Sequence, residues 1–448
     1  MQFVRNNKAL ILSIITISLP AIIEMALNTL VGMADTIMIS KYIGNEAISA
    51  AGNANQLVFT IIFVFSSFNV GATALISRSY GEKNYSRLNQ VAGQNLFFNI
   101  LIGIVITILS VAFGSHTMRI FDTTKEVFEM SVSYLNIVSY SQIFMFISFA
   151  VSASLRGVED TRTPMFVTSL VNILNIIGNY LLINGIGIFP KMGIEGAALS
   201  TTISRGVGAV LYIVILLRGN EYLKLKLMDL RITKEIFRPL WNLSSSAGLE
   251  QFLMQTSFFA MGIIITILDT TSEAAFRILI TIESISYMPA IGISIAAATL
   301  VGKALGEKDK NKAIHTGYIS IGLGILWGIF IGIVFLLFPA QIAGIFSNDP
   351  EVIKELIVPL IIAGFDQPLL GFVIVISGAL RGAGDTRTVM VLTSIRLWFV
   401  FVPLTYILIR FWNVGIKSVW ISEIIALLIF NLIMLRRFQE KKWADIEI

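Results

Sequence analysis

Four oxygen-bearing side chains fall inside apolar stretches of the first half of the chain: Asp35, Asn175, Asn179 and Thr201. Asn175 and Asn179 are four residues apart, so they share one face of a helix. With a rise of about 1.5 Å per residue, all four side chains can lie at one depth of a membrane. A carboxylate, two amide oxygens and a hydroxyl form an all-oxygen set, and such sets suit hard cations. We therefore expect a Na⁺ site made by these four residues.

Two other interpretations of this set stay open. Asp35 could carry a proton in place of Na⁺, because burial disfavours an ionised carboxylate. Asn and Thr side chains also join membrane helices by hydrogen bonds without binding an ion. A charged side chain at the bilayer centre costs at least ~2.5 kcal/mol, and this cost indicates a functional role for Asp35.

The second half has acids of its own inside apolar stretches, Glu250 and Asp366, and Gln367 follows the latter. Each acid lies about 15 Å from its end of the membrane. Two ionised carboxylates at mid-depth repel each other. We therefore expect that one is protonated, or that both share a cation or a cationic substrate. We interpret three further acids mainly as buried partners of arginines: Glu24, Glu283 and Glu423.

Composition places these residues in a membrane protein. The chain is 55% hydrophobic and 14% charged, and its mean hydropathy is +0.81. It has no Cys and two His, which excludes disulfides and thiolate metal sites and argues against a histidine proton relay. We find no nucleophile–base pair, phosphate-binding loop or metal-ligand cluster, so we do not expect an enzyme, and we expect no cofactor beyond a coupling ion.

Twelve apolar stretches are long enough to span a hydrocarbon core, which takes about 20 residues. They lie near 10–39, 47–77, 91–113, 127–154, 164–187, 194–217, 237–267, 274–302, 313–338, 353–379, 389–411 and 415–435. We expect an all-α integral membrane protein with twelve transmembrane helices.

Lys and Arg gather in the segments that face the cytoplasm if the N-terminus is inside. The positive-inside rule then puts both termini on the cytoplasmic side of the cell membrane. The most basic segment, 218–236, is the expected linker between two halves. Its charge is explained as a topology signal, so we expect the lipid bilayer as a partner and no nucleic acid.

A duplicated motif relates the two halves. Residues 155–163, LRGVEDTRT, recur as 380–388, LRGAGDTRT, at an offset of 225. Six spans per half give parallel repeats, so we expect two pseudo-symmetric six-helix bundles, 1–217 and 237–448, with a substrate cavity between them. The Gly and Asp of the motif suit a tight turn that caps the next helix, and we expect its Arg residues to anchor to lipid headgroups. The repeat does not copy the ion set, because Ala260 stands where the offset places Asp35.

These motifs together resemble the MATE (multidrug and toxic compound extrusion) family of secondary transporters, bacterial or archaeal type. The resemblance rests on the two Arg-Gly-x-x-Asp-Thr-Arg loops, Gly-Glu-Lys at 81 and 306, and three further segments, Gly32–Thr36, Gly196–Ala198 and Met288–Gly292. It implies an antiporter that exports organic cations by alternating access, driven by Na⁺ or H⁺.

The resemblance also implies site residues. Asp35, Asn175, Asn179 and Thr201 match the family's cation set in the N-lobe. Glu250 and Asp366 match a branch that has acids in spans 7 and 10. Another branch has Asp where this chain has Asn179, and the missing carboxylate favours Na⁺.

Two alternatives remain: a flippase for lipid-linked precursors, from a related branch, and a channel or non-transporting receptor. The flippase would need a strongly cationic cavity, and the intramembrane arginines are few and mostly near acids. Nothing in the sequence requires an oligomer, so we expect a monomer.

Overall fold

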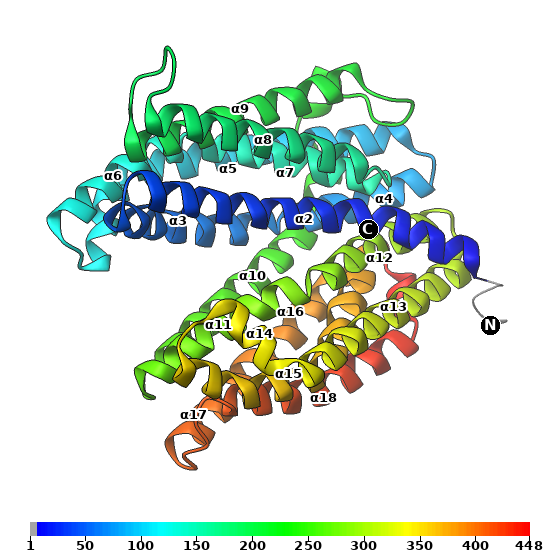
Figure 1. Ribbon diagram of the computed structural model, residues 1–448. Coiled ribbons are helices and arrows are strands. Elements are labelled where there is room, and N and C mark those ends of the chain that lie inside the picture. Colours follow the sequence, from blue (N-terminus) through cyan, green and yellow to red (C-terminus); the bar gives the residue numbers. More distant parts are fainter. Residues whose placement is uncertain (1–6) are drawn as a thin grey trace. The chain divides into compact units, whose positions relative to one another are not determined.

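The computed structural model describes residues 7–448, and every regular element in that range is helical (Figure 1). Within that range, eleven helical segments are long and apolar enough to cross a membrane, and a twelfth results if one bent pair of helices counts as a single span. The predicted fold class, an all-α membrane protein, is confirmed.

The elements of the first half match its six predicted spans, and two of those spans are broken. The second span is α3 followed by α4, and the fourth is α6 followed by α7, bent by 44°. The helices are α2 (Lys8–Tyr42), α3 (Asn45–Ser66), α4 (Asn69–Gly81), α5 (Tyr85–Met118), η1 (Arg119–Phe121), α6 (Lys125–Ser139), α7 (Ser141–Gly157), α8 (Arg162–Asn184), α9 (Gly193–Arg218) and η2 (Leu227–Leu230).

The second half has the same order of spans with three differences: its fourth span is one unbroken helix, α15, a short helix, α14, precedes that span, and a π-helical segment, η3, lies inside its fifth span. The helices are α10 (Lys234–Ile265), α11 (Thr270–Ser286), α12 (Met288–Gly306), α13 (Lys310–Leu337), α14 (Pro339–Phe346), α15 (Pro350–Gly382), α16 (Thr386–Ile395), η3 (Arg396–Phe401), α17 (Val402–Arg410), α18 (Ser418–Gln439) and η4 (Lys442–Asp445).

The chain divides into two compact units. One unit is Ile23–Ser244, and the other joins Ser245–Ile448 to the part of α2 that ends at Ile22. Helix α2 therefore belongs to both units, and Pro20 lies two residues before the change. These units differ from the segments 1–217 and 237–448 at two places. The start of α2, up to Ile22, belongs to the unit of the second half, and the start of α10, up to Ser244, belongs to the unit of the first half.

Small side chains bring helices together in the first unit. Helix α3 buries Ala47, Ala50, Ala51 and Ala54 in one hydrophobic cluster with residues of α6 and α9. Alanines allow close approach of helix backbones, which is how membrane helices gain packing energy without a hydrophobic driving force from water.

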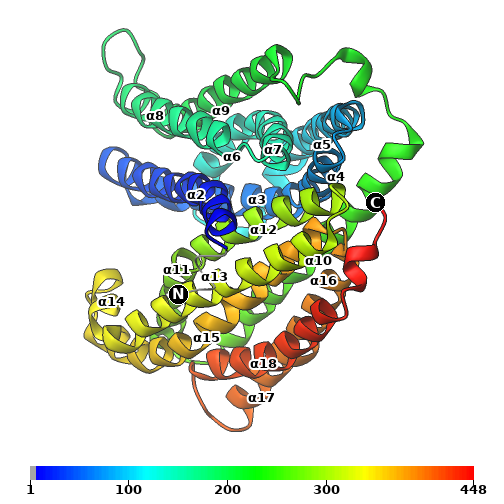
Figure 2. The same cartoon turned by 90° about the vertical axis from the view of Figure 1, so that its right-hand side faces the viewer.

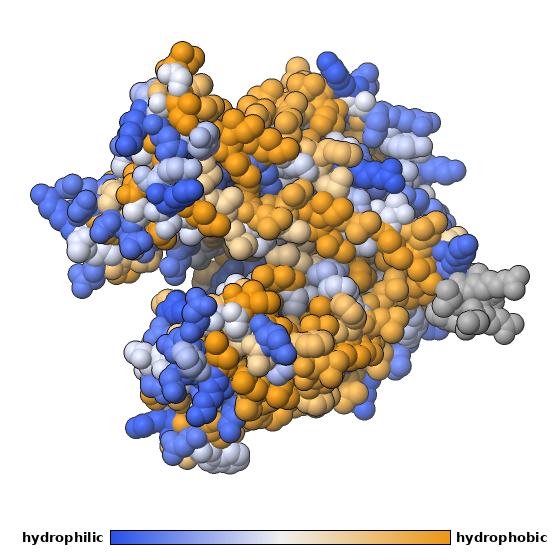
Figure 3. All heavy atoms as spheres, in the orientation of Figure 1, coloured by the Kyte–Doolittle hydropathy of each residue, from blue (hydrophilic) through white to orange (hydrophobic). Residues whose placement is uncertain are grey.

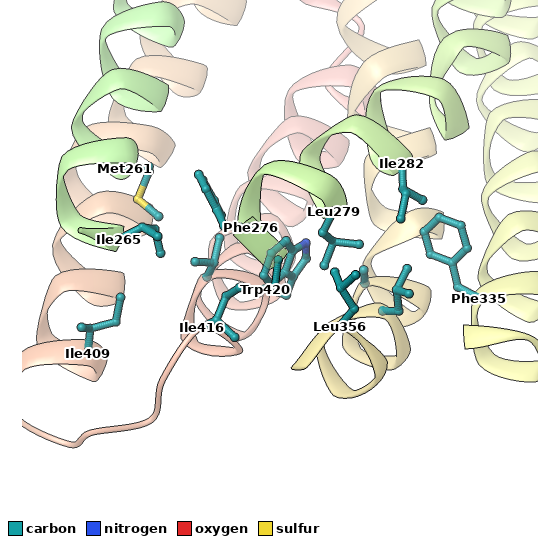
Figure 4. Packing of buried hydrophobic residues seen from close by; sticks show 14 of the residues in the cluster. Met261, Ile265, Phe276, Leu279, Ile282, Phe335, Leu356, Ile409, Ile416 and Trp420 are labelled. Carbon is teal, nitrogen blue, oxygen red and sulfur yellow. The ribbon is translucent and has the colours of Figure 1, made fainter. Parts of the chain in front are cut away.

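In the other unit, helices α13 and α15 lie side by side (Figures 1 and 2). Gly324, Gly328 and Gly332 of α13 repeat every four residues, and each faces the backbone of α15 so closely that an added Cβ would collide with a carbonyl oxygen. Two prolines, Pro359 and Pro368, lie inside α15. At the far end of this unit, a large apolar cluster includes aromatic and aliphatic side chains from α11, α15 and α18 (Figure 4).

Apolar side chains also cover the outside. On the face drawn in Figure 3, hydrophobic residues coat the flanks of the helices, and hydrophilic residues gather at the helix ends. Single examples are Phe399, which is 76% exposed, and Phe259, which is 70% exposed. A lipid-facing helix has this pattern because hydrocarbon solvates apolar side chains.

The backbone of the two halves repeats at the predicted offset. Lys83 and Lys308, 225 residues apart, both adopt positive φ angles, 56° and 62°. Each is followed by a residue whose side chain caps the next helix, Asn84 before α5 and Asp309 before α13. The duplication therefore includes turn geometry as well as sequence.

Candidate ion-binding site

The structure brings together the four residues predicted for the first half, within the unit Ile23–Ser244. Asn179 Nδ2 of α8 donates to Asp35 Oδ1 of α2 at 2.6 Å and lies 3.5 Å from Asn175 Oδ1. Asn175 Nδ2 in turn donates to Thr201 Oγ1 of α9 at 3.1 Å. A continuous chain of hydrogen bonds thus joins the carboxylate to the hydroxyl across three helices.

The local sequence explains this convergence. The polar face of α8 buries Asn175, 5% exposed, and Asn179, fully buried. Helix α9 packs closely on that face because Gly178 leaves no Cβ, which would otherwise collide with Ser200 Oγ. Ser200 Oγ then donates to the backbone oxygen of Asn175 at 2.9 Å. These contacts fix the backbones of α8 and α9 against each other at the level of the two amides.

One oxygen atom of these four side chains has no hydrogen-bond donor among the described residues. Asn179 Oδ1 is buried, and no described residue donates a hydrogen bond to it. Buried polar atoms are nearly always paired, so an unpaired carbonyl oxygen next to a carboxylate suits a missing cation or water. The oxygens that could serve a cation are those of Asp35, Asn175, Asn179 and Thr201, all of them hard ligands.

A positive side chain that sequence reasoning did not assign to this set lies nearby. Arg205 follows Thr201 by one turn of α9 and donates from Nη1 to Ser141 Oγ at 2.7 Å. It is close enough to interact electrostatically with Asp35 and with Tyr134. Its spacing of four residues from Thr201 is the signal that could have revealed it. The positive charge of Arg205 competes with an added cation for Asp35.

The acids of the second half have separate partners. Glu250 Oε1 of α10 accepts from Arg381 Nη2 at 2.6 Å, and its side chain is 7% exposed. Asp366 Oδ1 of α15 accepts from Gln367 Nε2 at 3.1 Å, and Gln367 Oε1 accepts from Ser286 Oγ at 2.9 Å. Glu250 is thus held in an ion pair, whereas Asp366 and Gln367 belong to a network with α11.

The expectation of headgroup anchoring is wrong for the first arginine of each motif, Arg156 and Arg381. Arg156 Nη2 pairs with Glu24 Oε2 of α2 at 2.8 Å, just as Arg381 pairs with Glu250 of α10. Each arginine therefore binds an acid in the first helix of its own half, because a nearly buried carboxylate needs a paired charge. The offset between the arginines is 225 and that between the acids is 226, so the ion pair is duplicated.

The expected helix cap is present in one of the two motifs. Asp160 Oδ1 accepts from the backbone N–H of Thr163 at 3.0 Å, in the first turn of α8. In the repeat, Asp385 accepts from Thr388 Oγ1 at 2.6 Å and also from Arg437 Nε at 2.8 Å. Asp160 therefore caps the start of α8, whereas Asp385 binds two side chains and makes no capping bond to the backbone of α16.

Comparison with known proteins gives a consistent result over the whole chain. Residues 20–181 and 247–407 match the family model MatE. The chain is 32% identical to the probable multidrug resistance protein NorM of Thermotoga maritima, over 96% of this chain and 92% of that protein. It is 26% identical to the probable multidrug resistance protein YoeA of Bacillus subtilis, over 96% and 93%.

Solved structures share the fold. A multidrug resistance MATE family transporter of the MOP superfamily, solved in an outward-facing conformation, has a TM-score of 0.88 at 22% identity, with 96% of each chain covered. A MOP superfamily transporter from Pyrococcus furiosus has a TM-score of 0.89 at 22% identity, with 97% of this chain and 96% of that chain covered.

Proposed function

This chain belongs to the MatE family, whose members are transporters and not enzymes, and we propose that it is an antiporter that exports lipophilic organic cations in exchange for Na⁺ or H⁺. The observation that carries the proposal is the hydrogen-bonded chain from Asp35 to Thr201, in which Asn179 contacts the carboxylate and keeps an unpaired Oδ1. A half-buried acid inside a membrane span, in one set with an unpaired amide oxygen, is suited to a positive ligand.

The export of drugs is supported by the relative from Thermotoga maritima, which carries the name of a probable multidrug resistance protein and matches nearly the full length. Organic cations are the class of drug we propose, because the ionisable residues that lie inside the spans are mainly acids. The distribution of Lys and Arg supports a cell-membrane protein with both termini in the cytoplasm.

The geometry supports a specific role for Asn179 in ion binding. Its Nδ2 donates to Asp35 Oδ1 in the structure. An amide turned by 180° would present Oδ1 to the carboxylate, and a Na⁺ held between the two oxygens would remove their repulsion. A proton on Asp35 would instead donate to that same oxygen. Both ions use one site, and the single carboxylate favours Na⁺.

Ion binding would act on helix α2. Asp35 and Pro20 lie on this one helix, and a proline inside a helix removes a backbone hydrogen bond and allows a bend. We infer that a bend at Pro20 weakens the hold on the drug and lets the protein release it outside. One charge that crosses 100 mV supplies ~2.3 kcal/mol, equivalent to about a forty-fold gradient of the exported cation.

The test is efflux of ethidium from proteoliposomes under a Na⁺ gradient at constant pH or under a pH gradient without Na⁺. Asp35→Asn would be compared with Asp122→Asn, the same chemical change at an exposed residue of the same unit. We expect gradient-driven efflux in the wild type and in Asp122→Asn, and at least tenfold slower efflux in Asp35→Asn, about 1.4 kcal/mol or more.

Efflux that stays unchanged in Asp35→Asn would refute the assigned ion site. Efflux driven by the pH gradient alone would make the proton the coupling ion at Asp35. If neither gradient moves any organic cation, drug export itself is the wrong proposal, and lipid-linked precursors become the substrates to test.

A further inference from the structure

The linker, residues 218–236, is folded onto helix α5 of the same compact unit, and Figure 2 shows it in green beside that helix. One side chain of α5, Asn89, makes two hydrogen bonds to the linker backbone. Its Nδ2 donates to the oxygen of Tyr222 at 3.2 Å, and its Oδ1 accepts from the N–H of Lys224 at 2.8 Å. The first part of the linker is therefore held beside the start of α5.

The second part of the linker contains the short helix η2 and packs directly on the backbone of α5. Gly93 of α5 makes this approach possible, because an added Cβ would collide with the backbone oxygen of Asp229. Gln94 Nε2 donates to Thr233 Oγ1 at 2.9 Å, and Asp229 Oδ2 accepts from the N–H of Lys226 at 2.8 Å within the linker. The linker therefore has a fixed orientation, with one side on α5 and the other side facing away from it.

The apolar residues of the linker divide between these two sides. Leu223 and Leu225 are buried, whereas Leu227 and Met228 are each 84% exposed, and Ile232 is half exposed. Single exposed apolar residues are common on proteins, but these exposed residues lie within six positions of one another. The packing of η2 on α5 thus leaves a small apolar surface without any described residue to cover it.

Basic side chains surround this apolar surface. Five basic residues of the linker are exposed: Arg218, Lys224, Lys226, Arg231 and Lys234. Within residues 7–448, none of these five forms an ion pair. The linker has three acids against them, so its net charge is +2. Its cationic groups are therefore available to an anionic partner.

The length of α5 places this surface at the level of lipid headgroups. Helix α5 has 34 residues and, at about 1.5 Å per residue, is about 20 Å longer than the ~30 Å hydrocarbon core. A centred helix of this length extends about 10 Å beyond the core at each end. Gly93, which contacts η2, lies about 12 Å from the start of α5 at Tyr85. Helix η2 is thus at the boundary between headgroups and acyl chains.

The second half shows the alternative arrangement. Helix η4 follows α18 as η2 follows α9, and it contacts α13, the span equivalent to α5. Its apolar side chains turn inward: Trp443 is fully buried and stacks on Phe438 with the ring centres 4.7 Å apart. Protein covers the apolar residues of η4, whereas Leu227 and Met228 of η2 face away from the protein.

We propose that the linker is a binding surface for anionic phospholipids. Leu227 and Met228 insert at the boundary between headgroups and acyl chains, and the basic side chains bind the phosphate groups around them. Each Lys or Arg close to an anionic membrane strengthens such binding about fivefold. A soluble acidic partner would use the charges alone, whereas a lipid surface uses both the charges and the apolar residues. This surface does not depend on which ion drives transport or on what is transported.

The chain has no Cys, so one added thiol can be labelled at a single position. Met228→Cys, labelled with bimane, would be studied in the full-length protein in nanodiscs that contain brominated phosphatidylglycerol or brominated phosphatidylcholine at equal mole fractions. Phe399→Cys, at a 76%-exposed residue inside a span, gives the lipid reference, and Thr123→Cys, in an exposed loop, gives the aqueous reference. We expect both lipids to quench the label at 228 more than at 123, and phosphatidylglycerol to quench it about threefold more strongly than phosphatidylcholine.

Replacing Lys224, Lys226 and Arg231 together by Gln in the labelled protein should make quenching by the two lipids equal. The matched control replaces three exposed lysines outside the linker by Gln and should keep the preference: Lys191, Lys354 and Lys417. An increase of KCl from about 0.1 M to about 1 M should reduce the preference without any change of the basic residues, because the Debye length falls from about 10 Å to about 3 Å.

Quenching at 228 that is no stronger than at 123 would place the linker in water and overturn the proposal, and an acidic soluble protein would become the partner to test. Equal quenching by the two lipids at low salt would also overturn it, because the apolar residues would then insert without recognition of charge. So would a preference for phosphatidylglycerol that survives both the triple Gln variant and high salt.

Discussion

The duplicated ion pair allows a quantitative prediction from burial alone. Glu250 and Arg381 lie 2.6 Å apart, with side chains 7% and 28% exposed. Glu273 and Arg277 lie 2.7 Å apart, but with side chains 32% and 75% exposed. The two pairs have nearly equal distances and different surroundings. Glu250→Gln and Glu273→Gln therefore make the same chemical change in a buried pair and in an exposed pair.

Removing one partner of a buried pair leaves the other charge without compensation, which costs about 3–5 kcal/mol. Arg381 keeps about a quarter of its side chain exposed, so we expect the lower end, ~3 kcal/mol, for Glu250→Gln. An exposed i,i+4 pair contributes about 0.3–0.5 kcal/mol, and Glu273→Gln should lie in that range. The double variant Glu250→Gln, Arg381→Gln should cost clearly less than the sum of the two single variants, with a coupling energy of about 2 kcal/mol.

The measurement is the free energy of unfolding of the purified protein in mixed micelles, titrated with denaturing detergent. Equal losses in Glu250→Gln and Glu273→Gln would refute the assignment of Glu250 to a structural ion pair. So would additive losses in the double variant. Ethidium transport by the folded Glu250→Gln protein separates the two roles, because a binding carboxylate would lose transport without any loss of stability.

Two further predictions concern other parts of the chain. Asn179→Asp puts a second carboxylate within 2.6 Å of Asp35, so one of the two must stay protonated, and efflux should change from Na⁺-driven to pH-driven; unchanged ion dependence would contradict the placement of Asn179 in the site. Gly328→Ala forces a Cβ into a carbonyl oxygen of α15 and should cost about 1–3 kcal/mol, whereas Gly322→Ala, with open space at the Cβ, should be neutral or slightly stabilising in the same unfolding assay.

The sequence was sufficient where distance along a helix decides position. The spacing of Asn175 and Asn179 defines a helical face, and the rise per residue places Asp35 and Thr201 at the same depth, so their meeting could be predicted from arithmetic. The structure confirms that these four side chains are joined by hydrogen bonds. Whether they bind Na⁺ stays a prediction, because no hydrogen-bond pattern identifies the ion.

The sequence was insufficient where partners come from distant helices. Arg381 and Glu250 are 131 residues apart, and a basic residue at the end of a span is equally compatible with headgroups and with an internal acid. The burial of the arginine side chain decides between these two partners. That burial depends on where the C-terminal end of α15 lies relative to Glu250 of α10. The available signal was the repetition of the pair in the first half, Arg156 with Glu24. Two arginines and two acids that repeat at nearly the same offset indicate that both halves use the same ion pair.

The duplication also separates what the fold needs from what was added to it. Both halves keep the arginine–glutamate pair, so a bundle of this type uses it for stability. The ionisable sets are not shared: Asp35 has Ala260 at its equivalent position, and Glu283 has Val58 at its own. Two bundles of one design can therefore carry different ionisable residues: the first has Asp35 among amide and hydroxyl oxygens, and the second has an ion pair between Arg396 and Glu423 that the first lacks.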